Sequence, residues 1–349
     1  MSLYRNLLLV VFALCAVSSA NATDVSGAGS SAAKPLYTSW AQAYHQAAAT
    51  DSVAYDPIGS SGGLKKIKER SVDFGASDVA MSRADAAKEN LICFPTSVSG
   101  VVPFVNLHGF KPGQINLSGP VLADIYAGKI KRWNDPAIVA LNRERAMPGD
   151  AIVPIARQDG SGTTYNFTDY LSKVSQSWRD AFGTNFLIPW PASVVQAKGS
   201  GGVVEAVVKT PNSIGYVDYS YVLEKNLAYA KLQNRGGQFV EPTFDAFTSA
   251  LTNSDWKTQG TFDEMLTDKS GVESWPITAG TFVIVPKVAT NPDKTIATLK
   301  FFSWAFMNGD GIARKVGSVR LTDSLQAKVY SLLTTVTDKN GKPLKWSIY

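Results

Sequence analysis

The sequence predicts an α/β protein of two lobes with mostly parallel sheets. Short apolar segments alternate along the chain with segments of helical periodicity, which is typical of parallel strands joined by crossover helices. Several of the apolar segments run into loops rich in serine and glycine. The chain has 349 residues and 45% of them are hydrophobic. This length favours two lobes with a ligand site between them.

The predicted elements follow one another from the start of the mature chain. Apolar segments predict strands at 53–58, 72–78, 100–106, 152–156, 214–217 and 281–285. Amphipathic spacing predicts helices at 36–44, from 64 onwards, and at 122–128, 138–141, 165–174, 203–209 and 296–304. The stretch from 232 to 271 is polar and supports no assignment. We find no internal repeat, coiled-coil heptad or low-complexity tract.

The first 22 residues have the pattern of a secretory signal peptide. Arg5 gives a basic start, an apolar run follows, and Ala20-Asn21-Ala22 is an A-x-A cleavage site. We expect cleavage after Ala22 and a mature chain without a membrane span. Its 33 basic and 29 acidic residues include no Lys/Arg block, so we expect no nucleic-acid partner.

Cysteine and histidine are too scarce for several kinds of site. Cys15 lies in the signal and has Leu14 before it, so we predict no lipid attachment. Cys93 is then the single cysteine of the mature chain, which precludes an internal disulfide, and its apolar neighbours predict burial. His45 and His108 are too few and too isolated for a zinc site or a His-based triad, and we expect no cofactor.

Three loops rich in serine and glycine lie at predicted helix starts, around Ser31, Ser60 and Ser161. A strand precedes each of them, although the one before Ser31 would be unusually short, and a fourth strand ends at Asp78. In open α/β sheets the carboxyl ends of strands form the ligand-binding edge. The free N–H groups of helix starts attract anions. Together the loops therefore predict an anion site at this edge.

The central stretch runs from Arg157 to Tyr165 and has a Gly-Ser-Gly-Thr motif at the start of a helix. Ser161 and Thr163 suit an N-cap, and the glycines allow the backbone to approach a ligand closely. Arg157 adds a planar, permanently charged fork that fits an oxyanion. The stretch predicts an anion site; the alternative is an ordinary capped helix with a surface arginine. For Ser60, as for Ser161, the alternative to ligand binding is a role as an N-cap.

Three catalytic or nucleotide-binding patterns fail on their context. Gly59–Gly63 fits the G-x-S-x-G nucleophile elbow, but that class of hydrolase needs a late histidine, and no histidine follows His108. Gly27–Ala32 fits a dinucleotide fingerprint in an exported chain with an unusually short strand before it. A P-loop would require Gly-Lys-Ser/Thr, which is absent. We therefore expect a binding protein and no enzyme.

With these residues in view, the chain resembles the phosphate-binding components of phosphate ABC transporters, the PstS family, over nearly the whole mature chain. The resemblance depends on the order and spacing of several segments and not on one motif. These segments are 27–29, 58–63, 73–78, 125–133, 159–163, 214–217, 275–278 and 300–305.

The resemblance implies a type II periplasmic-binding-protein fold, in which two α/β lobes joined by two crossing strands close on the ligand. It implies crossings near 96–100 and 277–281. Residues 23–98 and 280–349 would form lobe I, and residues 99–279 would form lobe II. It also implies a periplasmic location, delivery of phosphate to an inner-membrane permease with its ATPase complex, and a monomer.

Carried over residue by residue, the resemblance implies phosphate ligands on the three loops and at the strand end. Asp159 would orient the arginine. The expected ligands are Ser31, Ala32, Ser60, Asp78, Arg157, Ser161, Gly162 and Thr163. The first loop departs from the family pattern Ala-Thr-Phe-Pro, because it reads Ser30-Ser31-Ala32-Ala33. Ser31 keeps the hydroxyl, whereas Ala32 loses an aromatic ring, and Lys34 adds a cation.

Such a site would select its ligand through a proton. Phosphate near pH 7 keeps at least one proton, so a dry site needs many donors and one acceptor, and Asp78 would be the acceptor. Sulfate has no proton there and would set its lone pairs against the carboxylate. Two alternatives stay open. One is another tetrahedral oxyanion, and the other is phosphate sensing in place of transport. Lys65, Lys66 and Lys68 predict a solvated helix face.

Overall fold

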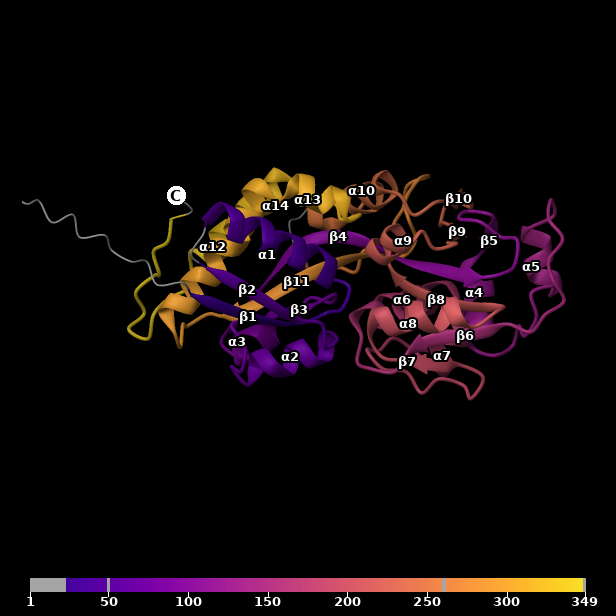
Figure 1. Cartoon of the computed structure of the whole chain (residues 1–349), viewed down its shortest axis with the longest axis horizontal. Coiled ribbons are helices and arrows are strands. Elements are labelled where there is room, and N and C mark those ends of the chain that lie inside the picture. Colours follow the sequence, from indigo (N-terminus) through magenta and orange to yellow (C-terminus); the bar gives the residue numbers. More distant parts are fainter. Residues whose placement is uncertain (1–22, 49–50, 259–261, 348–349) are drawn as a thin grey trace, which may run out of the picture.

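The computed structural model describes residues 23–48, 51–258 and 262–347. Two α/β lobes lie side by side along the long axis of the molecule, and two strands run from one lobe into the other (Figure 1). The predicted signal peptide lies outside the described residues. Among those residues, no helix combines the length and the apolar character needed to cross a bilayer.

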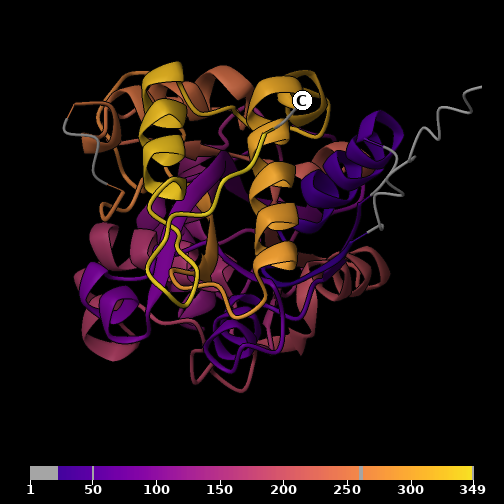
Figure 2. The ribbon, with the colours of Figure 1, turned by 90° about the vertical axis from the view of Figure 1, so that its left-hand side faces the viewer.

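The first lobe combines the beginning of the chain with its end. Its parallel strands are β1 (Asp24–Gly29), β2 (Ser52–Asp56) and β3 (Phe74–Ser77), in the order β2-β1-β3. Its early helices are α1 (Lys34–Ala48), α2 (Ser60–Lys68) and α3 (Arg83–Lys88). The C-terminal helices α12 (Pro292–Asn308), α13 (Asp310–Lys315) and α14 (Asp323–Leu333) complete it, and Figure 2 shows α12 and α14 against this end of the molecule.

The second lobe is built from the middle of the chain. Its strands are β5 (Ile115–Leu117), β6 (Val153–Arg157), β7 (Val195–Ala197), β8 (Ser213–Asp218), β9 (Ala230–Gln233) and β10 (Phe239–Val240). Its helices are α4 (Gly119–Tyr126), α5 (Pro136–Leu141), α6 (Gly162–Val174), α7 (Gln176–Ala181), α8 (Gly199–Lys209), α9 (Tyr219–Lys225), α10 (Phe244–Thr252) and α11 (Asp255–Thr258). β6 is parallel to β7 and β8.

Two long antiparallel strands join the lobes. β4 (Leu91–Asn106) pairs with β11 (Thr278–Pro286) over Leu91–Gly100, and from Val101 onwards it pairs with β8. One continuous eight-stranded sheet results, in the order β2-β1-β3-β11-β4-β8-β6-β7. The register between β11 and β4 shifts between Thr281 and Phe282, which indicates a β-bulge or a similar irregularity. Such bulges are frequent next to functional sites. The predicted type II periplasmic-binding-protein fold is confirmed.

Aromatic side chains pack the interior of each lobe. In the first lobe, Phe74 meets Phe302 edge to face at 5.1 Å between ring centroids. In the second lobe, Phe167 stacks on Tyr216 at 4.1 Å. The Tyr216 hydroxyl also accepts a hydrogen bond from the Arg157 backbone N–H at 3.4 Å and lies 2.7 Å from the Thr164 hydroxyl. The core of the second lobe therefore positions both ends of the central stretch.

Some local predictions need correction. The helix predicted at 203–209 begins four residues earlier, at Gly199. The stretch 232–271 contains α10 and α11, although its polarity supported no assignment. Cys93 is half-buried in β4, where a fully buried residue was expected. Burial raises the pKa of its thiol to about 12, so the thiol stays protonated near pH 7.

Candidate functional site

The predicted strand ends and loops meet where the two lobes face each other. β1 leads to Ser30 and Ser31, β2 to Gly59 and Ser60, and β3 to Asp78 in the first lobe. β6 of the second lobe ends at Arg157 and is followed by the loop before α6. Each loop leaves the carboxyl end of its strand, so the parallel order of the strands brings the loops together.

The backbones of the two lobes approach each other very closely at Gly162. A Cβ atom on Gly162 would lie 2.5 Å from the Ser60 hydroxyl and 2.8 Å from the Asp78 Cβ. Real Cβ atoms do not come so close to other heavy atoms, so only glycine fits here in the closed arrangement. The Gly162 N–H donates to the Ser60 hydroxyl at 3.1 Å. The first turn of α6 therefore docks directly on the first lobe.

Asp78 is the buried acid of this site. Its side chain is 4% exposed, and its Oδ2 accepts from the Ser30 hydroxyl at 2.7 Å and the Thr163 hydroxyl at 3.4 Å. Its Oδ1 accepts from Thr281 of β11 at 3.3 Å. Burial raises the pKa of the Asp78 carboxyl above its ordinary value, although these hydroxyls and the charge of Arg157 act in the opposite direction.

Arg157 and Asp159 form a buried ion pair at the end of β6. Arg157 is 2% exposed, and its guanidinium donates from two nitrogens to the two carboxylate oxygens of Asp159, with an Nε–Oδ1 distance of 2.8 Å. Burial alone would raise the pKa of Asp159, but the hydrogen bonds and charge of Arg157 hold that pKa below its ordinary value. The pair takes two of the five guanidinium N–H donors and fixes the plane of the fork.

The serine hydroxyls accept hydrogen bonds from backbone N–H groups. The Ser60 hydroxyl accepts from Asp78 at 3.3 Å as well as from Gly162, and the Ser161 hydroxyl accepts from Thr164 at 3.1 Å. A hydroxyl has two lone pairs and one proton. Backbone donors occupy both lone pairs of Ser60 and one lone pair of Ser161, so the proton of each hydroxyl is directed away from these N–H groups and is free for an acceptor. The lining is therefore rich in donors, which suits an anion.

Of the two serines Ser60 and Ser161, for which the sequence allows an N-cap role, only Ser161 is an N-cap. Ser161 is the N-cap of α6, as expected. Ser60 lies inside α2, whose N-cap is Gly59, and it makes no capping hydrogen bond. Its side chain is fully buried between Asp78 and Gly162 instead. The capping explanation of Ser60 is therefore wrong, and a role between the lobes replaces it.

The structure adds residues that the sequence did not single out. Ser30 and Thr281 donate to Asp78, and Asn166 donates to the Asp78 carbonyl at 2.8 Å. Ser200, at the start of α8, lies 2.8 Å from the Ser31 hydroxyl, and the Tyr221 hydroxyl donates to the Ser31 carbonyl at 2.9 Å. Only the Gly-Ser-Gly-Gly stretch around Ser200, at a helix start, gave a signal in the sequence.

The first loop keeps its predicted position but not every predicted feature. Ser31 is buried and Ala32 is half-buried, and the Ala32 N–H donates to the Ser30 hydroxyl at 3.1 Å. Lys34 is exposed and begins α1.

The lysines of α2 lie on its solvated face, as predicted. They form three ion pairs, which are Lys65–Glu69, Lys66–Asp56 and Lys68–Glu89.

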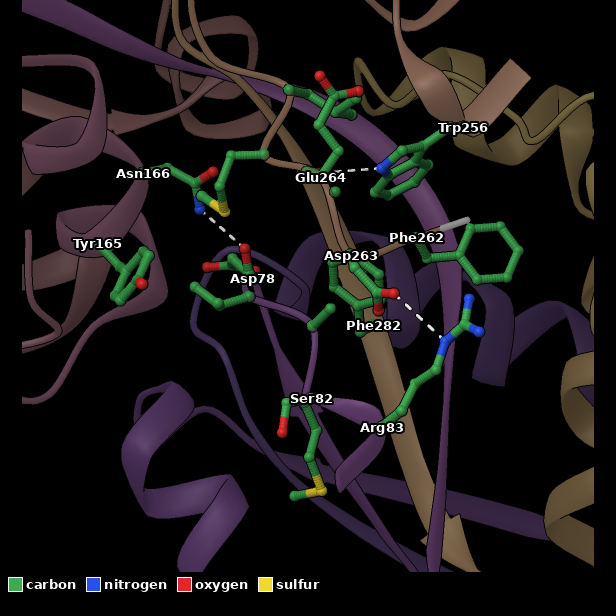
Figure 3. Close-up of a pocket in the computed structure, with 16 residues that line it drawn as sticks. Asp78, Ser82, Arg83, Tyr165, Asn166, Trp256, Phe262, Asp263, Glu264 and Phe282 are labelled. Carbon is green, nitrogen blue, oxygen red and sulfur yellow. Dashed lines mark hydrogen bonds and ion pairs between the residues drawn. The ribbon is translucent and has the colours of Figure 1, made fainter. Parts of the chain in front are cut away.

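A cavity of about 350 Å³ adjoins Asp78 on the side of Trp256 and Phe282 (Figure 3). Of the predicted ligands, Asp78 alone lines it. Arg83 and Asp263, which both line the cavity, form an ion pair 3.3 Å apart (Figure 3). Both side chains are largely exposed, so this pair contributes little to stability. The hydroxyl-rich site itself is closed between the lobes.

A two-lobed α/β chain with a buried, donor-rich site between its lobes defines a class of protein, the bilobal solute-binding proteins. Residues 16–308 match the family described as the PBP superfamily domain. A solved structure from Stenotrophomonas maltophilia, titled a phosphate binding protein, aligns with a TM-score of 0.66 over 93% of this chain and 100% of its own. At 19% identity this likeness shows the fold alone.

Curated relatives narrow the class to one family. The chain is 41% identical to the phosphate-binding protein PstS of Pasteurella multocida, over 97% of this chain and 98% of that protein. It is 40% identical to the phosphate-binding protein PstS of Haemophilus influenzae, over 89% of this chain and 93% of that protein. The chain belongs to the PstS family of phosphate-binding proteins. The predicted resemblance is confirmed.

Proposed function

We propose that this protein captures inorganic phosphate outside the cytoplasm and delivers it to an ABC permease for import. Its membership of the PstS family and the names of its relatives support this function. The observation that carries it is the pairing, between two closing lobes, of a buried carboxylate with a lining of hydroxyl, amide and guanidinium donors.

The ligands are those the sequence predicts. Donors come from the hydroxyls of Ser31, Ser60 and Ser161 and from the guanidinium of Arg157. The Thr163 hydroxyl and the amides of Ala32 and Gly162 now donate to Asp78, Ser30 and Ser60 respectively, and each would exchange that acceptor for phosphate. Each hydrogen bond to a charged group contributes about 1.5–3 kcal/mol net. Several such bonds are enough for micromolar or tighter binding after the costs of ordering and desolvation.

Asp78 is the group that distinguishes phosphate from sulfate. An ionised carboxylate offers about four acceptor positions, and three hydroxyls already occupy positions on this one. About one position is left for the proton that phosphate carries. Sulfate would bring a lone pair to the same place, in a buried site where two facing acceptors repel. Because burial raises the pKa of Asp78, this discrimination weakens as the pH falls towards that pKa and the carboxylate takes up a proton.

We infer the hinge between the lobes from the strand pairing. β4 changes its partner from β11 to β8 between Gly100 and Val101, and β11 begins at Thr278 opposite Gly100. We place the crossings in these two segments. Residues 23–98 with 280–349 then move as one lobe, and residues 99–279 move as the other.

The setting and the partners extend the same proposal. The mature protein works in the periplasm after cleavage at Ala22, without catalysis and as a monomer, and it docks on an inner-membrane permease with its ATPase complex. Binding of another tetrahedral oxyanion and a role in phosphate sensing are the two alternatives. The acid at the ligand site favours a protonated anion and so argues against sulfate.

Phosphate uptake in a deletion strain tests the transport function. We expect loss of uptake of radioactive phosphate at micromolar concentration, and its return when the wild-type gene is supplied. A gene that encodes Gly162→Ala should not restore uptake, because its lobes cannot close. Normal uptake in the deletion strain, together with an altered transcriptional response to phosphate starvation, would favour sensing and contradict transport.

A further inference from the structure

The first loop of the ligand site is held by the opposite lobe. Ser31, just before α1, lies with its hydroxyl oxygen 2.8 Å from the Ser200 hydroxyl and 3.1 Å from the Ser200 N–H. Tyr221 donates to the carbonyl of the same serine at 2.9 Å. Ser31 and Ser200 are 4% and 1% exposed. These hydrogen bonds form only when the two lobes meet.

The start of α8 is itself anchored in the site. The Gly199 N–H donates to Asp159 Oδ1 at 2.8 Å, on the carboxylate that fixes Arg157. The next amide, that of Ser200, donates to Ser31. Two successive N–H groups at the start of α8, which have no partner within the helix, thus bind Asp159 and Ser31 of the same site. These two hydrogen bonds restrict the position of Ser200.

Proton counting decides what Ser200 does to Ser31. The Ser31 oxygen accepts from the Ser200 N–H, which occupies one of its two lone pairs. If Ser31 donated to the Ser200 hydroxyl, it would have no proton left for an anion. If Ser200 donates, both lone pairs of Ser31 are occupied and its proton must point elsewhere. Beside an anion the second arrangement is favoured, because it leaves the Ser31 proton free to donate a hydrogen bond to the anion.

We propose that Ser200 is a positioning residue for phosphate binding, acting through Ser31. This inference rests on the proposed function. The Ser200 hydroxyl and N–H both donate to the Ser31 oxygen and so direct the Ser31 proton to the ligand. Ser200 makes no contact with phosphate itself. Since the two serines belong to different lobes, the Ser31 donor is oriented only on closure, which couples recognition to lobe movement.

A double-mutant cycle on the full mature chain tests this coupling. Phosphate affinity is measured by calorimetric titration for the wild type, Ser31→Ala, Ser200→Ala and the double variant. We expect Ser200→Ala to raise Kd about tenfold and Ser31→Ala to raise it at least as much. In the Ser31→Ala background, Ser200→Ala should change Kd less than twofold, because the residue through which it acts is already gone.

Ser213→Ala is the matched control. Ser213 is a buried serine of the same lobe whose hydroxyl donates to the carbonyls of Val207 and Thr210, on the segment that follows Ser200. Its loss should lower the thermal unfolding temperature and leave Kd within about twofold. Thermal unfolding without phosphate checks that every variant is folded.

The possible outcomes distinguish a failure of the Ser200 proposal from a failure of the proposed phosphate-binding function. If the effects of Ser31→Ala and Ser200→Ala multiply, Ser200 acts independently of Ser31 and the inference is wrong. An unchanged Kd in Ser200→Ala would overturn it as well. A folded wild-type protein that does not bind phosphate would overturn the proposed function first, and the inference with it.

Discussion

Replacing Asp78 by asparagine tests how the site chooses its anion. The Asp78 carboxylate is buried and accepts hydroxyl hydrogen bonds from Ser30, Thr163 and Thr281, with distances of 2.7, 3.4 and 3.3 Å. The variant exchanges one acceptor oxygen for an NH₂ group, which can only donate. With three hydroxyls already seeking acceptors, the position that takes the proton of phosphate is lost. The side chain keeps its size, so packing is preserved.

The size of the effect follows from the bond that is lost. A hydrogen bond to a charged group contributes about 1.5–3 kcal/mol, and about 1.4 kcal/mol corresponds to tenfold in Kd. We expect Asp78→Asn to weaken phosphate binding about 10- to 150-fold. Sulfate no longer faces a carboxylate and should bind more tightly than it binds the wild type. A site that bonds a ligand O–H rejects analogues without it by about 10⁴-fold, and we expect this ratio to fall to about 10² or lower.

Calorimetric titration with phosphate and with sulfate at pH 7.5 measures both sides of the ratio. Asp73→Asn is the control, since Asp73 is an acid of the same lobe that accepts from the N–H and the hydroxyl of Ser26. It should leave the ratio unchanged. If Asp78→Asn kept the phosphate-to-sulfate ratio of the wild type, Asp78 would not be the acceptor of the ligand's proton.

Three further variants test closure, the buried ion pair and a buried acid. Gly162→Ala places a Cβ 2.5 Å from the Ser60 hydroxyl. Overpacking of this kind costs about 3 kcal/mol, so we expect the phosphate Kd to rise 100-fold or more. An unchanged affinity in calorimetric titration would contradict the closed geometry. Asp159→Asn leaves buried Arg157 without its carboxylate partner. We expect the free energy of unfolding, measured in urea, to fall by about 3 kcal/mol, and added phosphate should restore part of this loss. A free energy of unfolding equal to that of the wild type would refute the ion pair. Burial raises the pKa of Asp218 from 3.8 to about 6, so ionisation costs the folded state up to about 3 kcal/mol above pH 6 and nothing below pH 4. Asp218→Asn should therefore stabilise the protein at pH 7.5 and not at pH 4, and an equal effect at both values in urea unfolding would count against the raised pKa.

Local patterns in the sequence were enough to predict the alternation of strands and helices and the loops at the strand ends. Those loops needed only a strand, a serine or glycine and a helix start in succession. The pattern failed for Ser60, because the same residues that suit an N-cap also suit a contact between lobes. Gly59 takes the cap position, and the buried hydroxyl of Ser60 goes to backbone groups of both lobes.

The contacts made by Ser30, Ser200 and Thr281 could not be predicted from local sequence. Ser200 and Ser31 are 169 residues apart, and Thr281 and Asp78 are 203 apart. Their meeting depends on the closure of two lobes and on the register of β11, which a residue pattern does not encode. Whether the predicted ligands bind phosphate stays a prediction that depends on direct measurement.

Selective phosphate capture is tested most directly by titrating the ligand-stripped, wild-type mature protein with phosphate and, separately, with sulfate near pH 7. We expect micromolar or tighter binding of phosphate and no detectable heat from sulfate. Equal binding of both anions would contradict the role of Asp78 as proton acceptor. Binding of neither anion by a folded protein would contradict phosphate capture itself.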